Sequence, residues 1–152
     1  MAGWTNKGKA HVLGVTFRGA TPPTNYYVAL VTSAAAPGAD TNTLSQLTEI
    51  ANGNGYTTGG YQLSRNSTDF DTLTENDTDD RGELQIKDIV WTASGGNLPG
   101  SGSGARYAVL TDDNGTVGSR EVYLYWDLSS DRTVSTGQAL TLQNCEIRIN
   151  ES

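Results

Sequence analysis

Side chains that could act as nucleophiles, general bases or metal ligands are scarce in this sequence. The chain has one His and one Cys in 152 residues. Catalytic and metal sites usually bring several such groups together, and His11 and Cys145 alone give little to assemble. We expect His11, close to Lys9, on a solvated face, and Cys145 as a small apolar group without a disulfide partner. The sequence therefore predicts a protein that is not an enzyme and that carries no cofactor.

An acid-rich segment, residues 69–83, could imitate a functional site. Its acidic side chains are Asp69, Asp71, Glu75, Asp77, Asp79, Asp80 and Glu83. Ca²⁺ binds carboxylate and carbonyl oxygens, but the segment lacks the order of residues that an EF-hand loop requires. Two of the carboxylates could instead hydrolyse a glycosidic bond, which depends on their separation in space. We expect a solvated acidic loop with no metal bound; a Ca²⁺ site and a glycosidase are the alternatives.

The composition is typical of a turn-rich β protein. Hydrophobic residues make up 36% of the chain and charged residues 18%, and 18 residues are Gly. The formal net charge of -7 disfavours nucleic acid as a partner, because nucleic-acid binding depends on Lys and Arg at the phosphates. No apolar run approaches the length of a membrane span, about 18 residues. We expect neither a nucleic-acid nor a membrane partner.

A short amphipathic helix is predicted near the start of the chain. Ala10, Leu13 and Phe17 recur at helical spacing within residues 5–18, which is the period of one helix face. Gly19 would end the helix in a left-handed cap. We expect the apolar face of this helix to pack on a β-sheet.

The rest of the chain predicts strands separated by turns. The expected strands are 26–32, 61–65, 82–92, 107–111, 117–128 and a final hairpin of 139–142 with 145–149. The side-chain phase changes near Lys87-Asp88, which predicts a bulge or a change of sheet. Asn114-Gly115 predicts a tight turn, and residues 43–51 predict a second, peripheral helix.

These elements predict one domain over residues 1–152. Its expected fold is all-β, an antiparallel β-sandwich that is jelly-roll-like, with a helical segment in residues 1–20 and the short peripheral helix. The Gly- and Ser-rich segment 95–104 is expected to form a surface loop rather than a linker between domains.

The chain has more aromatic side chains than one small core can hold. The candidate interface residues are Trp4, Phe17, Tyr56, Tyr61, Arg65, Tyr123 and Tyr125. Rings on a β-face can pack at subunit interfaces or stack on sugars. We expect Trp4 and Phe17 to anchor the helix to the sandwich, the tyrosines to form subunit contacts, and Arg65 to pair with an acid on a neighbouring subunit. Stacking on a glycan and plain burial in the core are the alternatives for the rings.

Several motifs follow one another along most of the chain, after the helix. They are Tyr-Tyr-Val-Ala-Leu-Val-Thr-Ser-Ala (26–34), Gly-Gly-Tyr-Gln-Leu-Ser-Arg (59–65), a strand ending in Trp91, Arg-Tyr-Ala-Val-Leu-Thr-Asp-Asp (106–113) and Val-Ser-Thr-Gly-Gln-Ala-Leu-Thr-Leu (134–142). In this order they resemble small bacteriophage virion structural proteins, described as head decoration, cement or tail-fibre-like proteins. Gly60, Tyr61 and Arg65 match the middle motif, and Gly137 and Leu140 match the last.

The resemblance implies a structural role on the capsid or tail surface of a virion, after synthesis in the host cytoplasm. The leading expectation is a capsid decoration or cement protein that binds the major capsid protein or other virion proteins and stabilises the assembled lattice. By analogy it would be a homo-oligomer such as a trimer. A tail or tail-fibre component, and a module that binds carbohydrate or a host receptor, are the alternatives.

Overall fold

The computed structural model describes residues 2–150 as ten strands, one α-helix and two 3₁₀ helices. The strands are β1 (Gly3–Trp4), β2 (Asn25–Val31), β3 (Tyr61–Ser64), β4 (Thr72–Asn76), β5 (Arg81–Ile86), β6 (Ile89–Thr92), β7 (Ala105–Thr111), β8 (Val122–Arg132), β9 (Ala139–Leu142) and β10 (Cys145–Asn150). The helices are α1 (Asn6–Arg18), η1 (Leu44–Gln46) and η2 (Val117–Ser119). Within residues 2–150 every strand pair is antiparallel, and the sheets stay open. The expectation of a β-rich chain with one N-terminal α-helix is confirmed.

Five strands form the main sheet, in the order β1-β8-β7-β2-β3. In β2, the residues from Val28 to Val31 have no exposed surface. Val28 and Leu30 belong to the core cluster that includes β6 and β9, whereas Ala29 and Val31 pack with the segment around η1. Burial on both faces explains why β2 is a continuous apolar run and not an alternating one.

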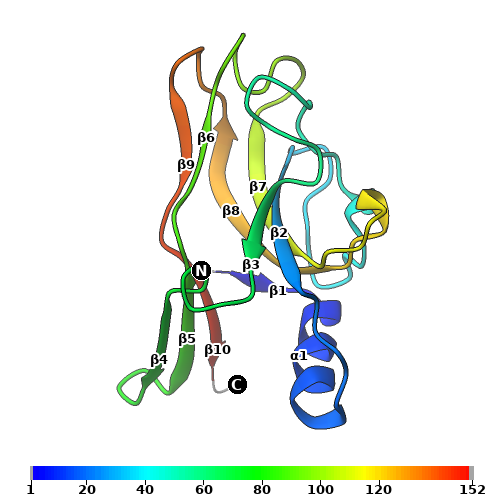
Figure 1. Ribbon diagram of the computed structural model, residues 1–152, viewed down its shortest axis with the longest axis vertical. Coiled ribbons are helices and arrows are strands. Elements are labelled where there is room, and N and C mark those ends of the chain that lie inside the picture. Colours follow the sequence, from blue (N-terminus) through cyan, green and yellow to red (C-terminus); the bar gives the residue numbers. More distant parts are fainter. Residues whose placement is uncertain (1, 151–152) are drawn as a thin grey trace.

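A bent two-stranded ribbon links the main core to a smaller sheet (Figure 1). β6 pairs with β9, and β5 pairs with β10. Only residues 87–88 separate β5 from β6, and only residues 143–144 separate β9 from β10, so the two pairs follow one another with a corner between them. The predicted change of sheet near Lys87-Asp88 is confirmed. The predicted final hairpin is wrong, because β9 and β10 each pair with a different half of the 81–92 segment.

β4 completes the smaller sheet, whose order is β10-β5-β4. Residues 69–83 are therefore largely a hairpin of β4 and β5 and not the loop that we expected, although most of their acidic side chains are exposed to solvent as expected. β-branched Thr72 and Thr74 favour the strand conformation of β4, and its side chains from Thr72 to Glu75 are exposed on both faces. The hairpin and α1 project from the same end of the molecule (Figure 1).

α1 begins and ends where the sequence predicts, but it turns a different face to the sheet. Thr5 Oγ1 accepts a hydrogen bond from Gly8 N at 2.9 Å, and Gly19 has a left-handed φ of 68°. The residue of α1 that is buried is Gly8, whereas Leu13 and Phe17 are 57% and 77% exposed. The expectation that Phe17 anchors the helix is wrong, because its stripe faces away from the sheet.

Gly8 explains how the helix is oriented. A Cβ at this position would lie 2.1 Å from the backbone O of Tyr123 in β8, so only glycine allows the helix backbone to approach the strand this closely. Thr5 Oγ1 also donates to Val122 O at 2.6 Å. The first helical turn is therefore held on β8 by backbone contacts, which outweigh the apolar periodicity of the later turns.

The predicted helix over residues 43–51 is wrong except for its first turn. Gln46 Oε1 accepts from Thr43 N at 3.0 Å, which closes η1. Leu47 then takes an extended conformation, and Glu49 forms a bridge with Val31 of β2. An extended path along the sheet replaces the helix because the chain here covers the second face of β2.

The predicted tight turn at Asn114-Gly115 is also wrong. Residues 112–121 form a longer loop that contains η2. Asp112 Oδ1 accepts from Asn114 N at 3.3 Å and from Glu121 N at 3.1 Å, so one carboxylate spans the loop. The strand expected from residue 117 therefore begins at Val122.

Candidate functional site

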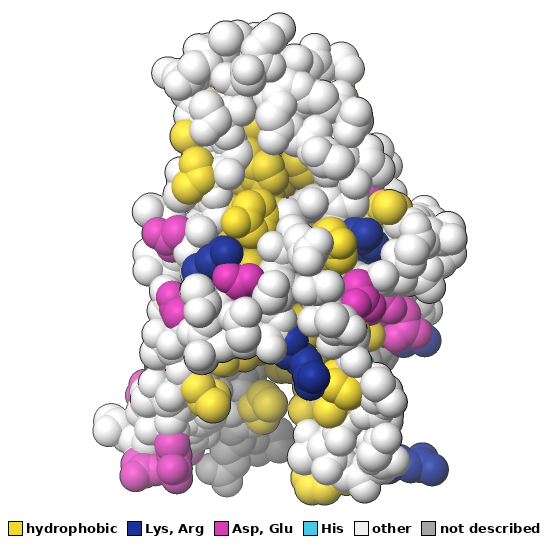
Figure 2. Space-filling model, in the orientation of Figure 1, with side chains coloured by type: hydrophobic (Ala, Val, Ile, Leu, Met, Phe, Trp, Pro, Cys, Tyr) yellow, Lys and Arg dark blue, Asp and Glu magenta, His cyan; other side chains and the backbone are white. Residues whose placement is uncertain are grey.

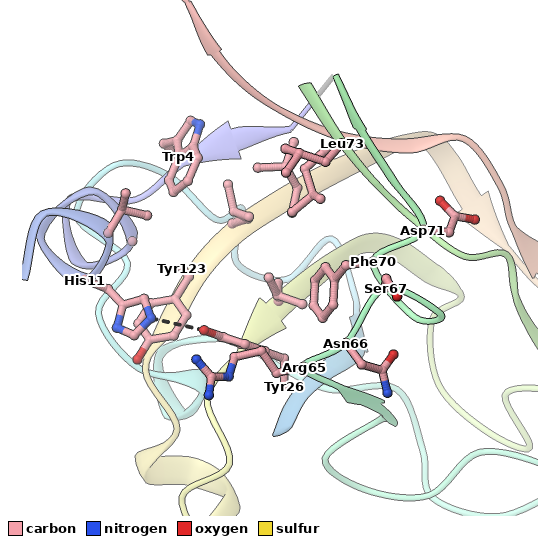
Figure 3. Close-up of a pocket in the computed structure, with 16 residues that line it drawn as sticks. Trp4, His11, Tyr26, Arg65, Asn66, Ser67, Phe70, Asp71, Leu73 and Tyr123 are labelled. Atoms are coloured by element: carbon pink, nitrogen blue, oxygen red, sulfur yellow. Dashed lines mark hydrogen bonds between the residues drawn. The ribbon is translucent and has the colours of Figure 1, made fainter. Parts of the chain in front are cut away.

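An apolar cleft separates α1 from the smaller sheet (Figure 3). It encloses about 480 Å³. Its aromatic lining is Trp4, His11, Tyr26, Phe70 and Tyr123, and its aliphatic lining is Val12, Leu73, Leu84, Leu110, Leu124 and Ile147. The cleft exists because the bent ribbon carries the smaller sheet past the main sheet, on the side opposite the helix.

Trp4 forms a wall that the cleft shares with a second hollow. Its Nε1 donates to Arg148 O at 2.8 Å, which ties β1 to β10. The second hollow encloses about 440 Å³ and is lined by Leu13 of α1 and Ile149 of β10 among others. Trp4 therefore stands where the start of the helix meets the smaller sheet.

His11 lies in the cleft and not on the solvated face where we expected it. Its ring stacks on Tyr123 with centroids 4.3 Å apart, and its Nε2 lies 3.2 Å from the hydroxyl of Tyr26. Burial lowers the pKa of His11 from its ordinary value, while the charges of Glu121 and Asp112 act in the opposite direction. The imidazole is favoured in its neutral form.

Aromatic contacts continue from His11 along the cleft. The ring of Tyr26 meets Phe70 edge to face with centroids 5.6 Å apart, and Tyr123 at 6.2 Å. Burial raises the pKa of both tyrosine hydroxyls above its ordinary value. The inner wall of the cleft is therefore an uncharged aromatic surface at neutral pH, with rings in favourable edge-to-face geometry.

Polar side chains lie on one side of the cleft mouth. Arg65, Asn66, Ser67 and Asp71 belong to the segment between β3 and β4 (Figure 3). Asn66 Oδ1 accepts from Asp69 N at 3.0 Å, which folds this segment into a turn. Within residues 2–150 Arg65 forms no ion pair, so its guanidinium is available at the rim.

Asp69 has a different role from the other acids of the 69–83 segment. Its Oδ1 accepts from Lys87 Nζ at 2.6 Å, and its Oδ2 accepts from Ser64 N at 2.7 Å. The hydrogen bond from Lys87 lowers the pKa of Asp69 and raises the pKa of Lys87 itself. Lys87 also lies 5.2 Å above the ring of Tyr61. Asp69 therefore fastens the β3–β4 connection to the ribbon.

Exposed apolar side chains gather at the same end as the cleft. Leu13 is 57%, Phe17 77%, Leu73 81% and Ile149 58% exposed; in residues 2–150, Val90 is the one other large hydrophobic side chain that is exposed. Figure 2 shows hydrophobic side chains on both sides of a hollow at the lower end of the molecule. We call the cleft together with these four side chains the open end. Grouped apolar exposure of this kind is typical of a binding surface.

Tyr56 lies away from the open end and is not at the surface. Its side chain is 2% exposed, and its hydroxyl donates to Glu49 Oε1 at 2.5 Å and accepts from Leu30 N at 3.0 Å. Burial is the largest reason why the pKa of Tyr56 is raised. The expectation of a subunit contact at Tyr56 is wrong, because its ring and its hydroxyl are both satisfied inside the chain.

The other predicted tyrosines also have partners within the chain. Tyr123 is 5% exposed and forms the cleft wall described above. Tyr61 meets Trp91 edge to face with centroids 6.3 Å apart. Tyr125 is half buried under Gly3, where a Cβ would lie 2.2 Å from its ring. The candidates that reach the open end are therefore Trp4, Phe17, Arg65 and Tyr123.

The structure adds residues to the open end that sequence reasoning missed, chiefly Phe70, Leu73, Ile149 and His11. Leu73 had a readable signal, since it is the one apolar residue in the polar strand Thr72–Asn76. In β10, Ile147 is buried, whereas Ile149 is 58% exposed. Sequence could not indicate that α1 and β4 would face one another.

Other candidate chemistry is limited in the described residues. Cys145 is a buried free thiol, and burial raises its pKa to about 12. Residues 2–150 contain no group of three or more His, Cys, Asp or Glu side chains that could hold a metal ion. In the same range, no helix has the length and apolar character needed to cross a membrane.

The open end combines an uncharged aromatic wall, exposed aliphatic side chains and a polar rim. Such a surface is suited to hold an apolar or aromatic surface of another molecule. Comparisons of the chain with models of protein families, with curated proteins and with solved structures find no match.

Proposed function

We propose that this chain is a non-enzymatic structural protein of a bacteriophage particle that binds neighbouring protein through the open end. The observation that carries the binding role is the outward stripe of α1, where Leu13 and Phe17 are 57% and 77% exposed. Full burial of one such side chain contributes about 1.5 to 3 kcal/mol. This gain is not made while the side chains stay in water, so a partner that covers several of them at one end would bind with it.

The virion part of the proposal depends on the sequence resemblance, which runs along most of the chain. We favour a capsid decoration or cement protein over a tail component. In this proposal the main sheet and the β6–β9 pair act as the two layers of a jelly-roll-like sandwich, and the open end contacts a neighbouring protein in the particle, either another virion protein or another copy of this chain. A protein that binds only the assembled lattice stabilises it by its binding free energy.

Rebinding to particles tests the proposal. Purified chain is mixed with capsids that lack it, and with isolated tails, and each mixture is sedimented. We expect saturable, stoichiometric binding to capsids and a higher temperature of capsid disruption. The variant Phe17→Ser should bind less than the parent chain, whereas Val90→Ser, which changes an exposed residue of β6 outside the open end, should bind equally. Absence of binding to both capsids and tails would overturn the proposal.

A carbohydrate or host-receptor module is the second candidate. It is favoured by one observation, the juxtaposition of Phe70 with the side chains of Asn66 and Arg65 at the cleft mouth. Sugars stack on aromatic rings and bond to amides and guanidinium groups. A glycan-array signal that is lost in Phe70→Ala and kept in Phe17→Ser would select this function over attachment to a particle.

A further inference from the structure

We infer that the protein that covers the open end is a second copy of this chain, with α1 of each copy packed against the β4–β5 hairpin of the other. The inference rests on the proposed function in one respect, that the open end binds protein. It goes further by naming the partner and the pairing of surfaces.

α1 is a purely basic element. Its sequence contains Lys7, Lys9 and Arg18 and no acidic residue. Lys7 bonds to Glu121 at 2.6 Å, whereas Lys9 and Arg18 form no ion pair with any residue of the described chain. Two free cations therefore flank the exposed apolar stripe of Leu13 and Phe17.

The β4–β5 hairpin has the opposite charge. Arg81 is its one cation and bonds to Asp79 at 2.7 Å and to Glu83. The remaining acids of the hairpin, Glu75, Asp77 and Asp80, are exposed and have no ion pair partner within residues 2–150. Leu73 lies in β4 and is 81% exposed, so this surface also combines an apolar side chain with free charges.

The signs of these charges select one pairing of two copies. β4 is an edge strand, and edge strands invite pairing with an identical strand. Pairing β4 with β4 would bring two acidic hairpins together, and pairing α1 with α1 would bring Lys9 and Arg18 toward their own copies; both arrangements are repulsive. Packing α1 on the hairpin matches Leu13 and Phe17 with Leu73 and matches cations with acids.

The position of the two elements makes the contact reciprocal. α1 and the hairpin project from the same end of the molecule, on the two sides of the cleft (Figure 1). A two-fold axis at this end would let each helix meet the hairpin of the other copy in one interface. Such self-complementary interfaces are the commonest kind in soluble oligomers.

The test is a pair of complementary variants of the full chain. Phe17→Asp places an acid on the basic helix, opposite the acidic hairpin; Leu73→Lys places a cation on the hairpin, opposite the basic helix. We expect the parent chain to have the mass of a dimer in analytical ultracentrifugation, with weaker association at high salt. Each variant alone should have the mass of a monomer. An equimolar mixture should recover the dimer, because Asp at position 17 then meets Lys at position 73.

Controls separate a lost interface from a lost fold. Residues 17 and 73 are highly exposed, so both variants should keep the circular dichroism spectrum and thermal midpoint of a folded monomer. Val90→Asp changes an exposed residue of β6 outside the open end and should leave the dimer intact. A dimer that survives either open-end variant, a mixture that stays monomeric, or a mass that grows without limit would overturn the reciprocal pairing.

Particle binding by the same variants separates this inference from the proposed function. A monomeric parent chain that binds capsids, and loses that binding in Phe17→Asp, would overturn the second-copy partner and leave the proposed function standing. A parent dimer that is lost in each variant and restored by mixing, but that binds no capsid or tail, would support the second-copy partner and overturn the proposed function.

Discussion

The surroundings of Tyr56 and the open end use aromatic and polar groups in opposite ways. At Tyr56 the ring is buried next to Trp91 and the hydroxyl has two partners, Glu49 and Leu30 N. At the open end Phe17 is 77% exposed, although it belongs to the helix whose apolar spacing predicted a core contact. Apolar periodicity therefore indicates that side chains share one face of a helix, but not that the chain itself buries that face.

The largest effect should come from the contact that fixes the helix. Gly8→Ala would place a Cβ 2.1 Å from Tyr123 O, a backbone atom that cannot move aside. We expect a loss of about 3 kcal/mol in the free energy of unfolding, because α1 must lift from β8. Chemical denaturation measures this loss.

Gly14→Ala is the matched control in the same helix. Its added Cβ would lie 3.6 Å from the Cβ of Ala20, an ordinary contact. Alanine favours the helix over glycine by about 1 kcal/mol, so this variant should be slightly more stable than the parent chain. Equal losses in both variants would show that Gly8 has no special role in orienting α1.

The next largest effect should come from the hydroxyl of Tyr56. Tyr56→Phe leaves Leu30 N and a Glu49 oxygen without this partner, and we expect a loss of about 2 kcal/mol in the free energy of unfolding. Tyr27→Phe removes an exposed hydroxyl that donates to Gln62 at 3.0 Å and should change stability little. Equal losses of unfolding free energy in Tyr56→Phe and Tyr27→Phe would show that the buried hydroxyl of Tyr56 has no special role in stability, which would contradict the contrast between the two regions.

A smaller, pH-dependent effect should come from His11. Burial lowers its pKa in the folded state, so the folded chain binds this proton less readily than the unfolded chain, whose imidazole pKa is about 6.5. The contribution of neutral His11 to stability is therefore complete above that pH and declines as the pH falls below it. The free energy of unfolding of the parent chain, minus that of His11→Gln at each pH, should decrease from pH 7.5 to pH 5.

The opposite pH trend would show that Glu121 and Asp112, which face His11, outweigh its burial. Asp69 titrates at lower pH and is present in both chains, so it cancels in this difference.

The smallest effect should come from Phe17. Phe17→Ser should change the free energy of unfolding by less than about 0.5 kcal/mol in dilute solution, because the ring is 77% exposed. A loss as large as that of Tyr56→Phe would mean that the stripe of α1 contributes to the core after all.

Local chemistry was enough to predict the parts of the fold that depend on neighbouring residues. The Gly19 cap of α1, β2 and the phase change at Lys87-Asp88 all follow from side-chain period and backbone preference. The final hairpin could not be predicted correctly, because the pairing of β9 with β6 and of β10 with β5 is a long-range choice. Residues 43–51 have helical spacing but cover a sheet, and that contact outweighs propensity.

The candidate site was predicted only in part, for a similar reason. Trp4, Phe17, Arg65 and Tyr123 were named from residue type, yet Tyr56 has the same type and is buried. Tyr56 is buried because its hydroxyl bonds to Leu30 N and Glu49 inside the chain. The sequence alone does not indicate that these two groups lie beside it. The orientation of α1 depends on Gly8, whose residue type lowers helix propensity and gives no sign of the strand that it packs against.

The bent ribbon determines which strand of the smaller sheet opens first in local fluctuations. β5 and β10 continue into β6 and β9, whose residues Ile89, Trp91, Leu140 and Leu142 are buried, whereas β4 is attached to β5 alone. Transient local opening should therefore begin with β4 peeling away, while the amide hydrogens shared by β5 and β10 exchange slowly with solvent. The β4 side of the open end can thus change its shape on contact with a partner, while the strand pairing of the ribbon stays intact.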